Sequence, residues 1–199
     1  MGIDPAPQMA NLYLYAYESN FMEKLTKVNY GEARKFNRTR RFIDDLHTIN
    51  NDGELEKHNK KGKIYPKEMK LNLENEDSHI ATFLDLDERI ENKEIIVKTF
   101  DKREAFPFEI VNYPDLSGNI PKRQAYRIFS SQLIRYARIC SKPQDLIDRV
   151  KLLTTKLLKK KYTIDGLKNA ARKCLNKHIW IREKLGRPSH KILLGQSHL

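Results

Sequence analysis

Two neighbouring aspartates, Asp44 and Asp45, are the residues whose type and spacing point most clearly to chemistry. They lie within "RFIDDLHTIN", between apolar residues and outside any turn rich in glycine or proline. Adjacent like charges repel, and burial strengthens the repulsion. The pair therefore indicates either a solvated hairpin tip or a site where a bound cation makes the arrangement favourable.

The residue two positions before the pair sharpens the second alternative. An aromatic residue, here Phe42, then any residue, then two aspartates at a strand–turn–strand junction is an arrangement that holds divalent metal for phosphoryl transfer. Carboxylate oxygens suit Mg²⁺, or Mn²⁺ in its place. Two such ions can activate a hydroxyl group and steady a leaving pyrophosphate. These four residues alone leave both alternatives open.

Other residues exclude several classes of protein. The six histidines show no ligand spacing with Cys140 or Cys174, so we predict no zinc site. The two cysteines form no spacing motif and fit a reducing compartment, which predicts an intracellular protein, with nucleus and cytoplasm both open. Neither a long apolar run nor a signal peptide is present, so no membrane partner is expected.

Positive charge gathers in the last third of the chain. Residues 1–120 contain 18 Lys and Arg against 22 Asp and Glu, whereas residues 121–199 contain 20 against 4. A basic segment joined to a slightly acidic body is typical of proteins that bind polyanions. The alternative is a merely soluble basic helical bundle.

The elements that must position the aspartates follow from the spacing of apolar residues. A helix begins at Pro7 and continues to about residue 25. Two strands meet at the aspartate pair, and a turn closes them at residues 50–53. Alternating apolar residues predict a strand over 68–74, and residues 80–90 and 94–100 predict a hairpin around "ENK".

After Pro121 the spacing becomes helical and predicts three helices, the second capped by Ser141 and the third opened by Thr163. We therefore expect an α+β protein with a helix-and-hairpin domain over 1–120, a basic three-helix bundle over 121–185 and a tail over 186–199.

The order of these features resembles the C-terminal half of a retroelement reverse transcriptase, of the non-LTR or Penelope-like type. Gly2 and Pro7 of "GIDPAP" match the glycine and proline of the family's motif B turn, with Ala6 where serine is usual. "FIDD" matches motif C, with Phe42 in place of tyrosine. The hairpin over 80–100 stands where the family has its primer-gripping hairpin, although Asp85 follows Leu84 where glycine is usual.

The resemblance implies a partial polymerase palm followed by a thumb-like bundle. It implies that Asp44 is a ligand of Mg²⁺ or Mn²⁺ with Asp45 beside it, and that Gly2, Pro7 and Phe42 support the nucleotide and template. It implies an RNA or DNA primer–template and deoxynucleotides as partners. The basic side chains expected to bind nucleic acid are Arg123, Arg127, Arg135, Arg138, Lys142, Lys156, Lys159, Lys160, Lys168 and Arg172.

The family's first metal-binding aspartate lies upstream of motif B, where this chain begins, so we expect no polymerase activity from these residues alone. Asp85 and Asp87 of "LDLDE" could substitute for it only in a permuted palm, and their alternation with Leu84 and Leu86 is what a plain solvated strand face gives.

Three hypotheses therefore stand. The first is a reverse transcriptase fragment, the second is a non-catalytic nucleic-acid-binding module derived from one, and the third is an unrelated basic helical domain. The oligomeric state is left open.

Overall fold

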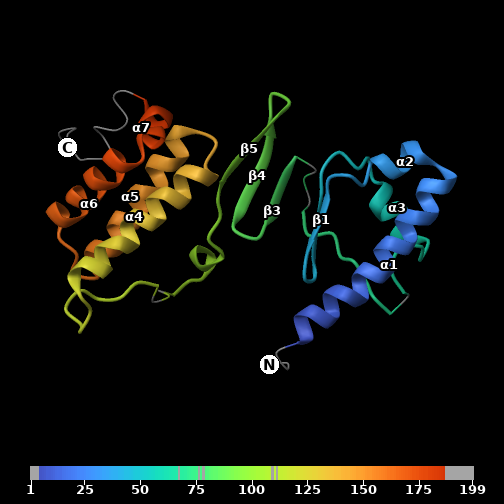
Figure 1. Ribbon diagram of the computed structural model, residues 1–199, viewed down its shortest axis with the longest axis horizontal. Coiled ribbons are helices and arrows are strands. Elements are labelled where there is room, and N and C mark those ends of the chain that lie inside the picture. The colour runs from blue at the N-terminus through green and yellow to red at the C-terminus, as the bar shows by residue number, and fades with distance from the viewer. Residues whose placement is uncertain are drawn as a thin grey trace. The chain divides into compact units, whose positions relative to one another are not determined.

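Helices and small antiparallel sheets alternate along the chain in the computed structural model, which describes residues 5–66, 68–75, 77, 79–108, 110 and 112–186. Within these residues the protein is α+β, with seven α-helices and two sheets. Contacts divide the chain into two compact units, Met1–Glu76 and Asp77–Leu199 (Figure 1). Each unit has its own hydrophobic core.

The first unit joins one long helix to a hairpin and two short helices. Its elements are α1 (Ala6–Val28), α2 (Tyr30–Arg34), β1 (Thr39–Phe42), β2 (Asp45–Thr48) and α3 (Glu54–Lys60). Pro7 lies in the first turn of α1, where a missing N–H costs nothing. The core holds Leu14, Phe21, Leu25, Ala33, Phe36, Ile64 and Tyr65.

The predicted apolar stripe of α1 is buried only in part. Phe21 and Leu25 are buried as expected, whereas Met9, Leu12 and Tyr13 are exposed. The first turns of α1 therefore present an apolar surface, and the second half of the helix holds the unit together.

The second unit begins with three strands and ends with four helices. Its elements are β3 (Ile80–Phe83), β4 (Leu86–Glu91), β5 (Glu94–Thr99), a short 3₁₀ helix (Lys102–Ala105), α4 (Lys122–Ile139), α5 (Pro143–Lys159), α6 (Ile164–Lys177) and α7 (Ile179–Leu185). The helices bury one continuous core, whose most enclosed side chains are Leu133, Leu146, Leu153, Leu157, Leu167 and Ile181.

Two contacts determine where α6 begins and how closely it packs on α4. Thr163 begins α6 as predicted, because its hydroxyl accepts a hydrogen bond from the backbone N–H of Gly166 at 3.2 Å. Tyr126 of α4 packs so closely on Gly166 that a Cβ atom there would overlap its ring. A short helix α7 follows the three predicted ones.

The predicted cap at Ser141 is wrong. Lys142 occupies the N-cap position of α5, and Ser141 instead pairs with β5. Its N–H donates to the carbonyl of Val97 at 2.7 Å, and its hydroxyl accepts from the N–H of Val97 at 2.9 Å. This loop therefore pairs with β5 and joins the sheet to the helices. The division between compact units consequently falls at 76/77, whereas the spacing of apolar residues changes at Pro121.

Two strand predictions need correction. No strand forms over residues 68–75, since Met69, Leu71 and Leu73 alternate without a partner strand and Leu73 is exposed. The segment 80–90 is not one strand but two, because the chain reverses at Leu84 and Asp85. The turn around residues 91–93 is confirmed by the pairing of β4 with β5.

Among the described residues, we find no helix with the length and apolar character needed to cross a membrane.

Candidate functional site

The two aspartates lie at the tip of the β1–β2 hairpin, as predicted. Phe42 pairs with Asp45 as the last pair of the ladder, so Ile43 and Asp44 form a two-residue turn. Both aspartates are exposed. Ile43 has a φ of 55°, a left-handed conformation that is unfavourable for a β-branched residue. Backbone strain of this kind is often retained where a turn must present a particular side chain.

A polar network fixes this hairpin to α1. The Nε atom of Arg41 donates to the Glu18 carboxylate at 2.7 Å, and the Tyr65 hydroxyl donates to the same oxygen at 2.6 Å. Arg41 also donates to the Asn11 side chain at 2.7 Å and to the carbonyl of Ile43 at 3.1 Å. One guanidinium group therefore connects the helix directly to the turn that carries Asp44.

Burial strengthens this network on the Tyr65 side. The Tyr65 hydroxyl is largely removed from water, and this burial, with the adjacent Glu18 carboxylate, raises the pKa of Tyr65 well above its usual value. Tyr65 therefore stays protonated and keeps its hydrogen bond to Glu18 across the physiological range.

The remaining residues of the predicted palm site are only partly placed. Phe42 is exposed beside the aspartates, and Pro7 is exposed in the first turn of α1. Gly2 lies outside the described residues. The hairpin tip thus combines two carboxylates with the apolar side chains of Phe42 and Ile43, which are 52% and 40% exposed.

The second unit contains a turn of the same kind with different electrostatics. Leu84 and Asp85 connect β3 to β4, and Leu84 also has a positive φ, 56°. Asp85 is paired with Arg135, and Asp87 lies 3.1 Å from the ammonium group of Lys98. Both carboxylates are therefore already neutralised, which removes the support for their role as substitute metal ligands.

Asp44 and Asp45 differ from that second pair in having no ion-pair partner among the described residues. Neither makes an ion pair with any residue that the structure describes. Two adjacent carboxylates without a basic partner are the kind of oxygen ligands that Mg²⁺ or Mn²⁺ binds. The hairpin tip can therefore accept a divalent cation without first losing an existing ion pair.

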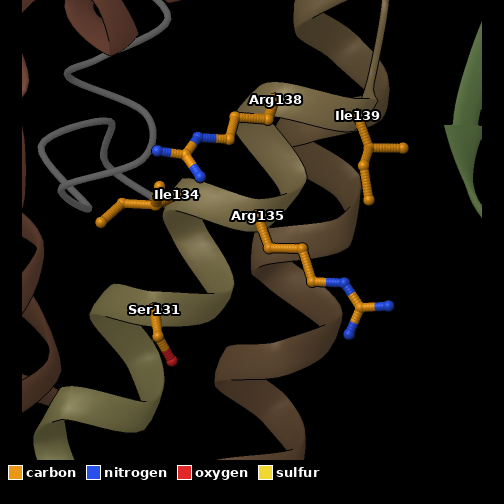
Figure 2. Close-up of a pocket in the computed structure, with 5 residues that line it drawn as sticks. All are labelled: Ser131, Ile134, Arg135, Arg138 and Ile139. Atoms are coloured by element: carbon orange, nitrogen blue, oxygen red, sulfur yellow. The ribbon is translucent and has the colours of Figure 1, made fainter.

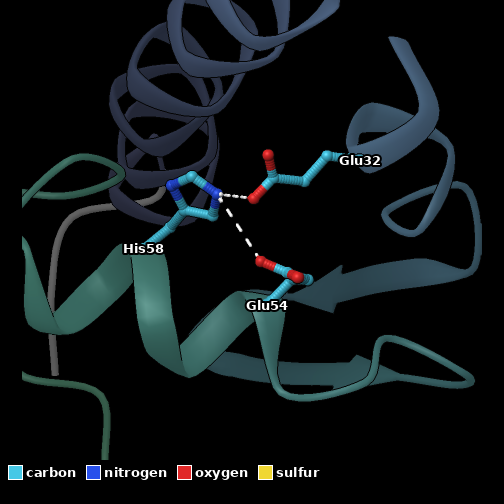
Figure 3. A group of neighbouring side chains, drawn as sticks. All are labelled: Glu32, Glu54 and His58. Atoms are coloured by element: carbon cyan, nitrogen blue, oxygen red, sulfur yellow. Dashed lines mark hydrogen bonds and ion pairs between the residues drawn. The ribbon is translucent and has the colours of Figure 1, made fainter. Parts of the chain in front are cut away.

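A third acidic group was missed by the sequence analysis. Glu32 of α2 and Glu54 and His58 of α3 gather with ligand atoms all within 4.8 Å of one another (Figure 3). It is the one group of three metal-ligating side chains found within the described ranges. The spacing of Glu54 and His58, four residues apart on a helix, was a possible signal, but nothing in the sequence indicated that Glu32 joins them.

Internal hydrogen bonds already neutralise this group. Nε2 of the buried His58 donates to Glu32 at 2.8 Å, and the Lys57 ammonium lies 3.2 Å from Glu32 and 2.8 Å from Glu54. The hydrogen bond from His58, with further ones involving Glu54 and Lys57, lowers the pKa of Glu32 to about 2. Lys57 and His58 already neutralise the two carboxylates, and the contacts of Glu32 with α3 join α2 to α3.

The basic side chains predicted to bind nucleic acid lie on α4 and α6 and on, or directly beside, α5. The exposed ones are Arg123, Arg127, Arg135, Arg138, Lys142, Lys159 and Arg172, and the partly exposed ones are Lys156, Lys160 and Lys168. Three of the ten are already paired with carboxylates of the same unit: Arg135, Lys142 and Lys156. The pairing with Lys142 lowers the pKa of Glu91.

Comparisons with protein-family models, with curated proteins and with solved structures found no match to this chain.

Proposed function

We propose that this chain is the palm-and-thumb portion of a retroelement reverse transcriptase, in which Asp44 and Asp45 hold the metal ions of nucleotide addition. The observation that carries the proposal is the contrast between the two hairpin turns. Both have an aliphatic residue at positive φ followed by aspartate, but only the turn at Asp44 lacks a basic partner among the described residues. Unneutralised carboxylates in a strained, anchored turn favour a functional role.

The order of elements adds support. A long helix that begins at Pro7 precedes the aspartate hairpin, and a second hairpin and a basic helical bundle follow it. This is the order that the resemblance implies for the end of a palm and its thumb.

Each part has a distinct role in the proposed reaction. Divalent metal ions supply the positive charge that stabilises phosphoryl transfer. Asp44 binds them, Asp45 contributes from the adjacent strand, and Arg41 keeps the turn in position through Glu18 and the Ile43 carbonyl. The basic helices bind the phosphate backbone of the primer–template.

Metal binding can be tested on the chain itself. When Mn²⁺ is added, the NMR signals of residues 42–46 should broaden before those of residues 83–87. Asp44→Asn should remove this preference, whereas Asp85→Asn, at the matching position of the other turn, should leave it unchanged. Equal broadening of both turns would contradict a metal site at Asp44.

Catalysis needs the part of the palm that the resemblance places upstream. The fingers and first palm strand of an intact reverse transcriptase should therefore be joined ahead of this chain, and primer extension measured with Mg²⁺. Asp44→Asn should lower the rate about a thousandfold, because losing several kcal/mol of charge stabilisation has that effect. Binding of the template should change little, since the substitution removes no basic side chain.

A second candidate is a non-catalytic nucleic-acid-binding module. It is favoured by the excess of Lys and Arg over Asp and Glu in residues 121–199, and it requires no metal. For this candidate, the chain would bind a duplex equally well with and without a chelator, and the Mn²⁺ experiment would give no preference for residues 42–46.

A further inference from the structure

Two groups of basic side chains in the second unit differ in whether a carboxylate lies beside them. The first group faces the sheet and the 3₁₀ helix. We call its members the sheet-side cations: Arg135, Lys142, Arg149 and Lys156. Each of them is paired with a carboxylate from Asp85, Glu91 or Glu104. Arg149 lies 2.8 Å and Lys156 lies 2.9 Å from the carboxylate oxygens of Glu104.

The second group belongs to α6, and we call it the outer α6 face. The helix buries one side against the core, through Leu167, Ala170, Ala171, Cys174 and Leu175. The remaining side carries cations and amides, namely Lys168, Asn169, Arg172, Lys173, Asn176 and Lys177. None of its four cations makes an ion pair with a residue in the described part of the chain, and Asp165 in the first turn is the helix's single acid.

The two groups lie on different sides of the bundle. Strand β5 contacts α4 and α5, whereas α6 contacts α4 and α7. In Figure 1, α4 and α5 accordingly lie between α6 and the sheet. Figure 2 shows the same separation on α4 itself, since Arg135 points toward the sheet and Arg138 points the other way.

Pairing decides which cations can bind a phosphate group at low cost. A basic side chain that is paired with a carboxylate brings that negative charge next to any phosphate group it contacts, so its net gain from the contact is smaller. A basic side chain that is exposed to water without a carboxylate partner has no such opposing charge beside it. A 14-residue helix is about 21 Å long, which matches the axial length of about six base pairs of a duplex at 3.4 Å per base pair.

We propose that the outer α6 face binds the phosphate backbone of a nucleic-acid duplex, and that the acids of the sheet and the 3₁₀ helix withhold the sheet-side cations from that contact. This inference rests on the proposed nucleic-acid binding and specifies the face that performs it. Asn169 and Asn176 lie between the cations and add neutral hydrogen-bond donors for phosphate oxygens.

The test compares two variants of the full chain, each of which loses three positive charges. The outer variant is Lys168→Gln, Arg172→Gln and Lys173→Gln. The sheet-side variant is Arg135→Gln, Lys142→Gln and Lys156→Gln. Binding of a labelled DNA duplex of mixed sequence is followed by fluorescence anisotropy across a salt series, and circular dichroism checks that each variant is folded.

The outer variant should reduce the slope of log affinity against log salt by about 2 to 3, since each phosphate contact contributes about 0.9. The sheet-side variant should change the slope by less than one contact. Equal losses in the two variants would overturn the choice of face while leaving nucleic-acid binding itself in place. No binding by the unsubstituted chain would overturn both proposals.

A third variant keeps the test decisive if the outer variant does not fold. The third variant replaces the acids that neutralise the sheet-side cations, with Asp85→Asn, Glu91→Gln and Glu104→Gln. Those cations should then be free to contact phosphate groups. The slope of log affinity against log salt should then become steeper, by about 0.9 for each cation that gains a phosphate contact. An unchanged slope would show that pairing with the sheet does not limit binding, which would contradict the proposal.

Discussion

Glu18→Ala should loosen the hairpin that carries Asp44, although Glu18 itself lies on α1. Its carboxylate accepts hydrogen bonds from Arg41 at 2.7 Å and from Tyr65 at 2.6 Å. A hydrogen bond to a charged group contributes about 1.5–3 kcal/mol. The Arg41 side chain is 13% and the Glu18 side chain 27% exposed, so water restores part of the loss. We expect a net cost of about 2 kcal/mol for the first unit.

The measurement is native-state hydrogen exchange read by mass spectrometry on peptides from each unit. A loss of 2 kcal/mol corresponds to exchange about 30-fold faster in peptides that cover α1 and the β1–β2 hairpin. Peptides from the second unit should exchange at their original rates, because the hydrogen-bond partners of Glu18 all belong to the first unit.

Glu23→Ala is the matched control. Glu23 lies on the same helix, but its pair with Lys27 is exposed on both sides, and such pairs contribute less than about 1 kcal/mol. The change in helix propensity is the same in both variants, so it cancels in the comparison. Equal acceleration of exchange by the two substitutions would refute the anchoring role given to Glu18 and Arg41.

Three further outcomes are expected. Gly166→Ala should lower the stability of the second unit by about 1–3 kcal/mol, because the new Cβ would overlap the Tyr126 ring, and thermal melting followed by tryptophan fluorescence measures this. Leu133→Ala, at a fully buried position, should cost about 2–5 kcal/mol in the same assay. The lowered pKa of Glu32 contributes stability that is complete above about pH 4.3 and is lost as the pH falls toward 2. Glu32→Gln should therefore flatten that part of an acid titration of the first unit, followed by circular dichroism.

The long helices and the hairpins could be predicted because their signals are local. Pro7, the alternation around Asp44 and the helical spacing after Pro121 each depend on residues close in sequence. The strand over 68–74 failed because alternation needs a partner strand, which the sequence does not reveal. Helices α2 and α3 were missed because they have only five and seven residues, too few for a periodic pattern.

The candidate site was predictable to the same extent. The position of Asp44 and Asp45 at a hairpin tip followed from the sequence, since strand signals flank them. Their lack of a basic partner did not, because that depends on where Arg41 points, and its guanidinium is directed to Glu18. Likewise, Arg135 and Arg172 look alike in the sequence. Only the fold reveals that Arg135 is paired with Asp85, a residue 50 positions away.

The unequal distribution of charge in the second unit also affects how fast and in what orientation a polyanion arrives. Residues 79–108, which form the sheet and the 3₁₀ helix, carry seven carboxylates and five cations, whereas residues 164–185 carry six cations and two carboxylates. The unit is therefore more positive over its helices than over its sheet, which gives it an electric dipole moment. A nucleic acid that diffuses toward the unit orients it before contact, so that collisions in which the helices lead are favoured over those in which the sheet leads. Association should accordingly be fastest at low ionic strength. It should slow as added salt shortens the Debye screening length, because the nucleic acid then orients the unit only at close range.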